Sequence, residues 1–164
     1  RQLLRSGCTT VADIEAVPEL LPEVWTATPL RVLSFLELLS VRRRQTPAAL
    51  MSEAVRRCRA LASDRCRAAL SPHALYSTNA ELLHLVRRAS RRARWPLTMH
   101  VAESVAEFEM FQQSRGPMFD WLRRNGRDAS DCGGRSPVRQ TLSATAATST
   151  QRSAPQRGSS ASRR

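Results

Sequence analysis

Two histidines and a glutamate stand where a protein built of alternating strands and helices could use them for chemistry. His100 ends a short apolar run, Glu103 follows three residues later, and His73 ends an earlier run. A histidine can bind a metal ion, and a nearby carboxylate can carry protons to and from a water molecule that the metal activates. Polar residues also end strands for purely structural reasons, and the spacing alone leaves both interpretations open.

The elements that would position these residues follow from the apolar pattern. Short β-rich runs alternate with helical patterns from about residue 7 to residue 126, which is typical of βαβ units and a parallel sheet. We predict strands near residues 7–13, 66–71 and 97–101. The run 30–39 fits a strand or a buried helix segment, and Pro29 before it favours the strand.

Capping residues predict where the helices begin. Thr46 followed by Pro47 is typical of an N-cap and a first helical residue. The segments 78–81 and 104–107 both read as capping boxes, in which a Thr or Ser and a Glu three residues later satisfy each other's backbone N–H groups. The segment 96–104 is therefore predicted as a strand between two helices. Gly116 and Pro117 are predicted to interrupt the second helix, and Gly126 to end the short helix that follows.

This arrangement predicts where the polar residues meet. The carboxyl ends of parallel strands lie at one edge of a sheet, which is where such folds place their active sites. We therefore expect His73 and His100 to face one cavity, with Glu103 in the loop beyond the strand. His84 falls inside a helical pattern and is expected on the helix surface or in its packing, and Asp13 is interpreted as structural.

Composition limits the class of protein. The chain has 164 residues, of which 41% are hydrophobic, and this suits one domain with a core. It has no apolar run of membrane-spanning length and no signal-peptide pattern, so a soluble cytoplasmic protein is expected. The net charge is +12, and all 26 basic residues are arginines. The densest basic run, residues 87–94, lies opposite an apolar helix face, which indicates a solvated surface rather than a nucleic-acid site.

The chain divides at about residue 138. Residues 1–138 are predicted to form one domain, and residues 1–6 read like the end of a helix, so the chain is expected to begin inside that domain. Residues 139–164 contain Thr, Ser, Ala, Gln and Arg without a periodic apolar face. A segment of this kind buries too little surface to offset its ordering entropy, so a disordered tail is predicted.

Four motifs in order resemble one known family. They are "GCTTVADI", "SPHALYSTNAELL", "LTMHVAESVAEFEMF" and "SRGPMFDWL". Together they resemble the metal-dependent amidohydrolase superfamily, in the branch of cytosine, guanine and adenosine-type deaminases and chlorohydrolases, over about residues 3–138. The resemblance implies an α/β fold, a partial TIM-like (β/α) barrel with about strands two to five of eight and their helices.

The resemblance also implies roles for the three residues. His100 would be the metal ligand at the end of the fifth barrel strand, Glu103 the general acid/base, and His73 a substrate contact at the end of the fourth strand. The cofactor would be a divalent metal, zinc first and iron as the alternative. The partner would be a small nitrogen heterocycle, nucleobase-like or nucleoside-like, that metal-activated water deaminates. A homo-oligomer of the full-length protein is left open, and no membrane partner is expected.

The sequence departs from the family pattern in two ways. Leu75 replaces the proline usual in the motif around His73. The paired His-x-His of the first strand would lie upstream of Arg1, and the later histidine and aspartate ligands would follow residue 138, where the chain has neither residue type. A catalytic zinc needs about three protein ligands. We therefore expect this chain to lack a complete active site, and a catalytically incomplete fragment or pseudoenzyme is the alternative.

Overall fold

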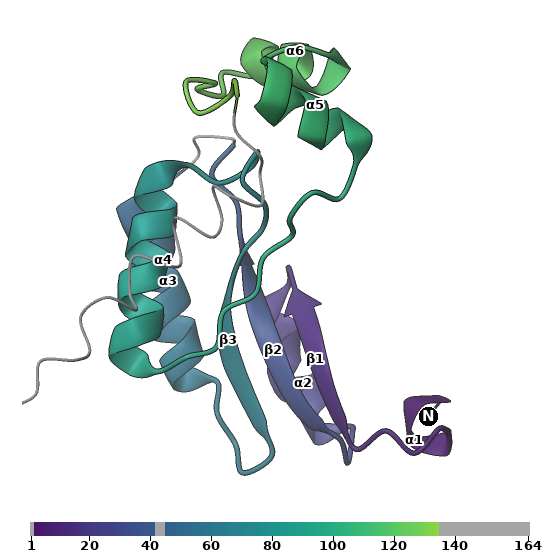
Figure 1. The fold of residues 1–164 in the computed structure, drawn as a ribbon. Helices are drawn as coiled ribbons and strands as arrows, with labels where there is room; N and C mark the ends of the chain where they lie inside the picture. The colour runs from purple at the N-terminus through teal and green to yellow at the C-terminus, as the bar shows by residue number, and fades with distance from the viewer. Residues whose placement is uncertain (1, 42–44, 135–164) are drawn as a thin grey trace, which may run out of the picture.

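The computed structural model describes residues 2–41 and 45–134 of the chain (Figure 1). The elements run α1 (Gln2–Arg5), β1 (Thr10–Glu15), the 3-10 helix η1 (Pro18–Leu20), α2 (Leu21–Thr26), β2 (Arg31–Leu38), α3 (Pro47–Ala60), β3 (Cys66–Pro72), α4 (Ala80–Ala93), α5 (Val105–Gln113) and α6 (Pro117–Arg124). The three strands form a parallel sheet in the order β1-β2-β3. The predicted tail, residues 139–164, lies outside the described residues.

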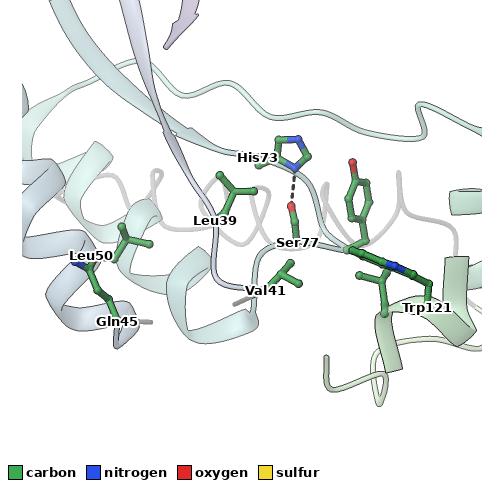
Figure 2. Close-up of a pocket in the computed structure, with 9 residues that line it drawn as sticks. Leu39, Val41, Gln45, Leu50, His73, Ser77 and Trp121 are labelled. Atoms are coloured by element: carbon green, nitrogen blue, oxygen red, sulfur yellow. Dashed lines mark hydrogen bonds between the residues drawn. The ribbon is translucent and has the colours of Figure 1, made fainter. Parts of the chain in front are cut away.

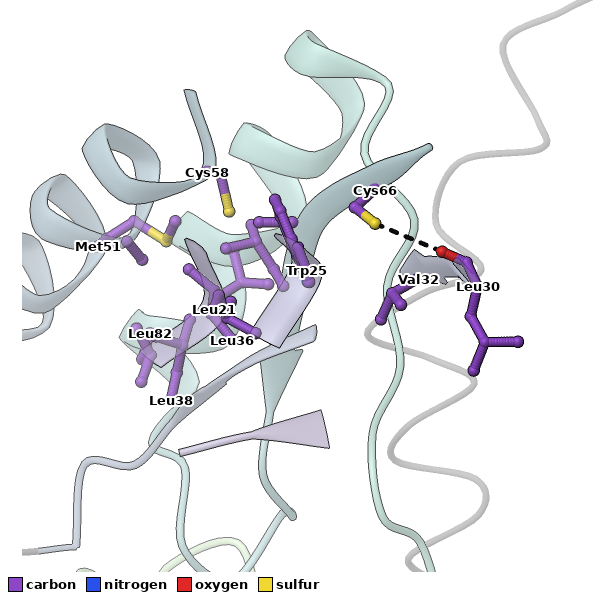
Figure 3. Close-up of a cluster of buried hydrophobic side chains, with 14 residues drawn as sticks. Leu21, Trp25, Leu30, Val32, Leu36, Leu38, Met51, Cys58, Cys66 and Leu82 are labelled. Atoms are coloured by element: carbon purple, nitrogen blue, oxygen red, sulfur yellow. Dashed lines mark hydrogen bonds between the residues drawn. The ribbon is translucent and has the colours of Figure 1, made fainter. Parts of the chain in front are cut away.

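The sheet has two different faces, because successive side chains of a strand point to opposite sides. One face packs against α2, α3 and α4 and forms the main core (Figure 3). This core contains Leu21, Trp25, Leu30, Val32, Leu36, Leu38, Met51, Ala54, Cys58, Cys66, Ala68, Leu70, Leu82 and Val86. The alternate positions of β2 and β3, which include Phe35, Glu37 and Ser71, therefore face away from these helices.

A second layer lies beyond the carboxyl ends of the strands. Helices α5 and α6 pack together there, at the end of the sheet to which the strand arrows of β1, β2 and β3 point (Figure 1). Their small core joins Leu75, which follows β3, to Met110, Phe111 and Leu122. The turn after β3 is thus held between the sheet and this second layer.

Most of the predicted elements are confirmed. Residues 31–38 form strand β2, and α3 begins at Pro47 with the Thr46 hydroxyl accepting a bond from the N–H of Ala49 at 3.2 Å. Gly116 precedes α6, whose first residue is Pro117. The capping box at Thr78 is wrong, because the Asn79 side chain accepts the bond from the N–H of Leu82 and caps α4.

The predicted strand 97–101 is replaced by two isolated bridges, one to β3 and one to the turn after it. Leu97 pairs with Leu70 and His100 pairs with Ala74, so three steps along the segment from Leu97 match four steps from Leu70. In a parallel ladder the N–H of position 72 would make the next bond after Leu70, and proline has no N–H to give. The N–H of His100 instead bonds to the carbonyl of His73 at 2.8 Å.

The basic helix α4 has the predicted arrangement. Leu82 and Val86 are buried in the main core, while Arg88, Arg91 and Arg92 are exposed. Within residues 2–41 and 45–134, no helix combines the length and the apolar character needed to cross a membrane.

Candidate functional site

The predicted site residues meet at the carboxyl end of the sheet. His73 directly follows β3, and His100 lies beside it through the bridge between His100 and Ala74. The two imidazole rings have their centroids 5.1 Å apart. The expectation that the two histidines lie side by side is therefore confirmed. The cavity described below is lined by His73 and not by His100, so the expectation that both face one cavity stays a prediction.

A third residue, Glu37, joins them from the end of β2. One carboxylate oxygen of Glu37 lies 3.9 Å from Nε2 of His73, and both side chains are about four-fifths buried. Glu37 was not among the predicted site residues, although it is the one acid within the apolar run 30–39. That isolated carboxylate near a strand's carboxyl end was the available signal.

The turn after β3 fixes the ring of His73. Nδ1 of His73 lies 2.6 Å from the hydroxyl oxygen of Ser77, and this hydroxyl also accepts a bond from the N–H of Ala74. Ser77 is buried, so the hydroxyl has a fixed position. Leu75, the departure from the family motif, is buried in the second core, and the turn closes through the N–H of Ser77 and the carbonyl of Ala74.

Glu103 lies next to His100 as expected. One of its carboxylate oxygens is 3.1 Å from Nδ1 of His100, and its side chain is 44% exposed. An imidazole that donates from Nδ1 presents the lone pair of Nε2 to a cation. The pair therefore offers a ligand atom and a proton carrier at the same place.

The donor types suit a divalent metal. Glu37, His73 and His100 each offer one ligand atom, and these atoms lie within 4.8 Å of one another. Two histidines and a glutamate are a donor set that binds catalytic zinc. Ser71 of β3 lies directly opposite Glu37 of β2 in the sheet. The Ser71 hydroxyl is buried and has no hydrogen-bond partner among the described residues. A polar atom left without a partner beside three metal-ligand side chains fits a site made for an additional polar group.

An apolar cavity adjoins His73 (Figure 2). It has a volume of about 600 Å³ and is lined by Leu39, Val41, Gln45, Leu50, His73, Tyr76, Ser77, Trp121 and Leu122. The Trp121 side chain is half-exposed, and the ring of Tyr76 meets the ring of His73 edge-on at 5.5 Å. Volumes of this size and aromatic linings are typical of small-molecule sites.

Tyr76 connects the cavity to the carboxylates. Burial raises the pKa of Tyr76, and the negative charges of Glu103 and Glu107 together with a hydrogen bond to Glu103 raise it further. The phenol therefore keeps its proton at neutral pH and can donate it to a carboxylate or a ligand. Tyr76 lies within the motif around His73, but it was not among the predicted site residues.

Arg127 clamps the turn that carries His73 and Tyr76. Its guanidinium donates to the carbonyls of Tyr76 at 2.8 Å and Leu75 at 3.1 Å, and it pairs with both carboxylate oxygens of Asp131 at 2.7 Å. The Arg127 side chain is only 9% exposed. The two carbonyl contacts span about fifty residues of chain, so no local pattern could predict them.

Known proteins resemble this chain over part of their length. No family model matches the chain. The chain is 30% identical over 121 residues to an aminodeoxyfutalosine deaminase of Deinococcus radiodurans, a match that covers 72% of this chain and 29% of that protein. The chain therefore spans less than a third of the length of this curated relative.

Solved structures share the fold. An aminofutalosine deaminase of Helicobacter pylori matches with a TM-score of 0.70 and 20% identity, covering 85% of this chain and 35% of that one. The same deaminase has also been solved with methylthio-coformycin. A zinc-bound adenosine deaminase of Xanthomonas campestris matches with a TM-score of 0.57 and 19% identity, covering 76% of this chain and 29% of that one.

The relatives and the site point to the same group of proteins. The curated relative and the solved structures are deaminases, one of them with zinc. In this chain, histidines and carboxylates gather where the strands of the sheet end. These similarities indicate the metal-dependent amidohydrolase superfamily, and the chain corresponds to a section of the length of these enzymes.

Proposed function

We propose that this chain is a section, about strands two to five, of a TIM-like barrel that deaminates a nucleobase-like or nucleoside-like heterocycle with a divalent metal, zinc first. The observation that carries the proposal is the meeting of His73, His100 and Glu103 at the carboxyl end of the sheet. Active sites of (β/α) barrels are built at this end. The deaminase relatives support hydrolysis of a carbon–nitrogen bond.

Each residue has a proposed task. When bound, the divalent cation supplies the Lewis acidity that makes water a nucleophile near neutral pH. His100 would hold the cation through Nε2, since its Nδ1 faces Glu103 at 3.1 Å. Glu103 would take the proton from the attacking water and pass it to the ring nitrogen and then to the leaving ammonia. Its half-exposed carboxylate has the freedom that this transfer requires.

The substrate would lie in the cavity beside His73. The His73 ring is oriented by Ser77 and can donate to, or accept from, a polar atom of the heterocycle. Trp121 and Tyr76 line the cavity and offer aromatic surface to a planar ring. The rest of the metal site would come from parts of the barrel that this chain does not contain.

The test is an ammonia-release assay on adenine, guanine, cytosine and their nucleosides. It compares the 164-residue chain with the longer protein encoded by the genomic reading frame around it. We expect turnover only from the longer protein, because the first-strand His-x-His pair and the later ligands of the family pattern are expected outside this chain. Turnover by the chain itself, or none by the longer protein on any of these compounds, would contradict the proposal.

Two substitutions in the longer protein separate the roles. His100→Ala should lower metal content and turnover together. Glu103→Gln should keep the metal and lower turnover about a hundredfold or more, because the relay needs a titratable group. The matched controls are His84→Ala and Glu109→Gln, which change an exposed histidine and an exposed glutamate. Full activity of Glu103→Gln would refute the assigned mechanism.

A further inference from the structure

A second glutamate, Glu107, lies behind the turn that carries Glu103. Its side chain is fully buried. Its carboxylate accepts a bond from the N–H of Glu103 at 2.8 Å and another from the N–H of Ala102 at 3.2 Å. The capping box predicted a bond to the N–H of Ser104, so the carboxylate reaches one and two residues further back than expected.

The turn has few other restraints. Before the turn, the N–H of His100 bonds to the carbonyl of His73, and the first bond of α5 is made by the N–H of Phe108 to the carbonyl of Ser104. Ala102 between them has φ of 56°, in the left-handed region that costs an L-residue roughly 1–2 kcal/mol. A turn that holds an alanine in this conformation needs contacts that fix it.

Glu107 supplies these contacts through both oxygens of one side chain. A carboxylate offers only acceptors, so both of its oxygens can receive backbone N–H groups. Glutamine has one acceptor and one NH₂ group, and the NH₂ group would face a backbone N–H. The N–H of Glu107 itself donates to the Ser104 hydroxyl at 3.1 Å, which ties the same carboxylate to the start of α5.

We infer that Glu107 is a positioning residue for Glu103: its buried carboxylate holds the 102–103 backbone so that the Glu103 carboxylate faces His100. The inference rests on the proton-transfer role proposed above for Glu103. It goes beyond that role, because it assigns the orientation of Glu103 to a residue that does not reach His100 or the cavity.

The first test uses the 164-residue chain and NMR. In the wild-type chain, we expect scalar couplings across the hydrogen bonds from the amide nitrogens of Ala102 and Glu103 to Cδ of Glu107. Glu107→Gln should speed amide exchange of these two residues at least tenfold and remove the NOEs between the His100 ring and the Glu103 side chain. Glu109→Gln, on the exposed side of the same helix, should change neither.

Two outcomes of the NMR test would overturn the inference. Unchanged exchange and NOEs in a folded Glu107→Gln chain would overturn the inference. If this variant does not fold, the wild-type couplings decide, and their absence from spectra that show the helical backbone couplings would also overturn it.

The second test is a double-mutant cycle in the longer protein. Glu107→Gln should lower kcat at least tenfold with KM and metal content nearly unchanged. In a Glu103→Gln background it should add almost nothing, because a residue that acts through Glu103 has no effect once Glu103 is inactive. Additive losses would show an independent structural role and overturn the inference. A fully active Glu103→Gln would instead refute the proposed mechanism, and the NMR test would still decide whether Glu107 holds the turn.

Discussion

The two turns that carry the site are held in opposite ways. The turn after β3, residues 73–78, is mostly buried and is fixed by side chains: Ser77 inside it, Leu75 packed below it and Arg127 clamped over it. The segment 96–104 is half-exposed, with one bridge to β3, one to Ala74 beyond it, and the Glu107 carboxylate behind it. Under the proposed function, His73 contacts the substrate and can have a rigid support, whereas Glu103 carries protons and must move between partners.

The largest expected effect comes from removing the clamp on the rigid turn. Arg127→Ala should lower the free energy of unfolding by about 3 kcal/mol, because it leaves two carbonyls and Asp131 without their guanidinium partner. Urea unfolding of the chain measures this loss. Arg124→Ala, which changes an exposed arginine of the neighbouring helix α6, should cost less than about 0.5 kcal/mol. Equal losses in the two variants would show that Arg127 is not a clamp.

The reactivity of Cys132, which follows the Arg127 partner Asp131, can be measured in the unmodified chain. Burial, and then the charge of Asp131, raise the pKa of Cys132 to about 11. The thiolate is the reactive form, and an unperturbed thiol has a pKa of about 8.5. At pH 8, alkylation of Cys132 should therefore be about a hundredfold slower in the folded chain than in urea, and it should rise about tenfold per pH unit up to pH 10. Mass spectrometry of labelled peptides measures both rates. A flat pH profile would show that access rather than ionisation limits the reaction.

The smallest expected effect concerns Ala102 in the half-exposed segment 96–104. Ala102→Gly should raise the free energy of unfolding by about 0.5 kcal/mol. Glycine adopts the φ of 56° without the Cβ penalty, and this gain exceeds the stability lost because glycine gives the unfolded chain more conformational entropy. Ala106→Gly, inside α5, should instead lower the stability by about 1 kcal/mol. If both variants lose stability equally in urea, Ala102 is not strained in solution.

The sequence predicts the parts of this molecule that follow from local patterns. The start of α3 at Pro47 and the cap of α5 at Ser104 are read from neighbouring residues, and they are confirmed. The meeting of His73 and His100 follows from a general rule about parallel strands, so it could also be predicted.

Other features depend on contacts that no local pattern contains. Asn79 rather than Thr78 caps α4, because two adjacent residues could serve and tertiary packing buries one of them. Glu37 enters the site through the register of β2 on β3, which the sequence does not reveal. Arg127 reaches the turn after β3 from about fifty residues away.

Pro72 has a consequence beyond the ladder bond that it cannot make. Continuation of the ladder from Leu70 would pair His100 with His73, whereas in the structure His100 pairs with Ala74. The backbone of His100 is therefore held one residue further along the turn after β3, where its N–H reaches the carbonyl of His73 at 2.8 Å. A single imino acid on one strand thus shifts the point at which the neighbouring segment is anchored to that turn.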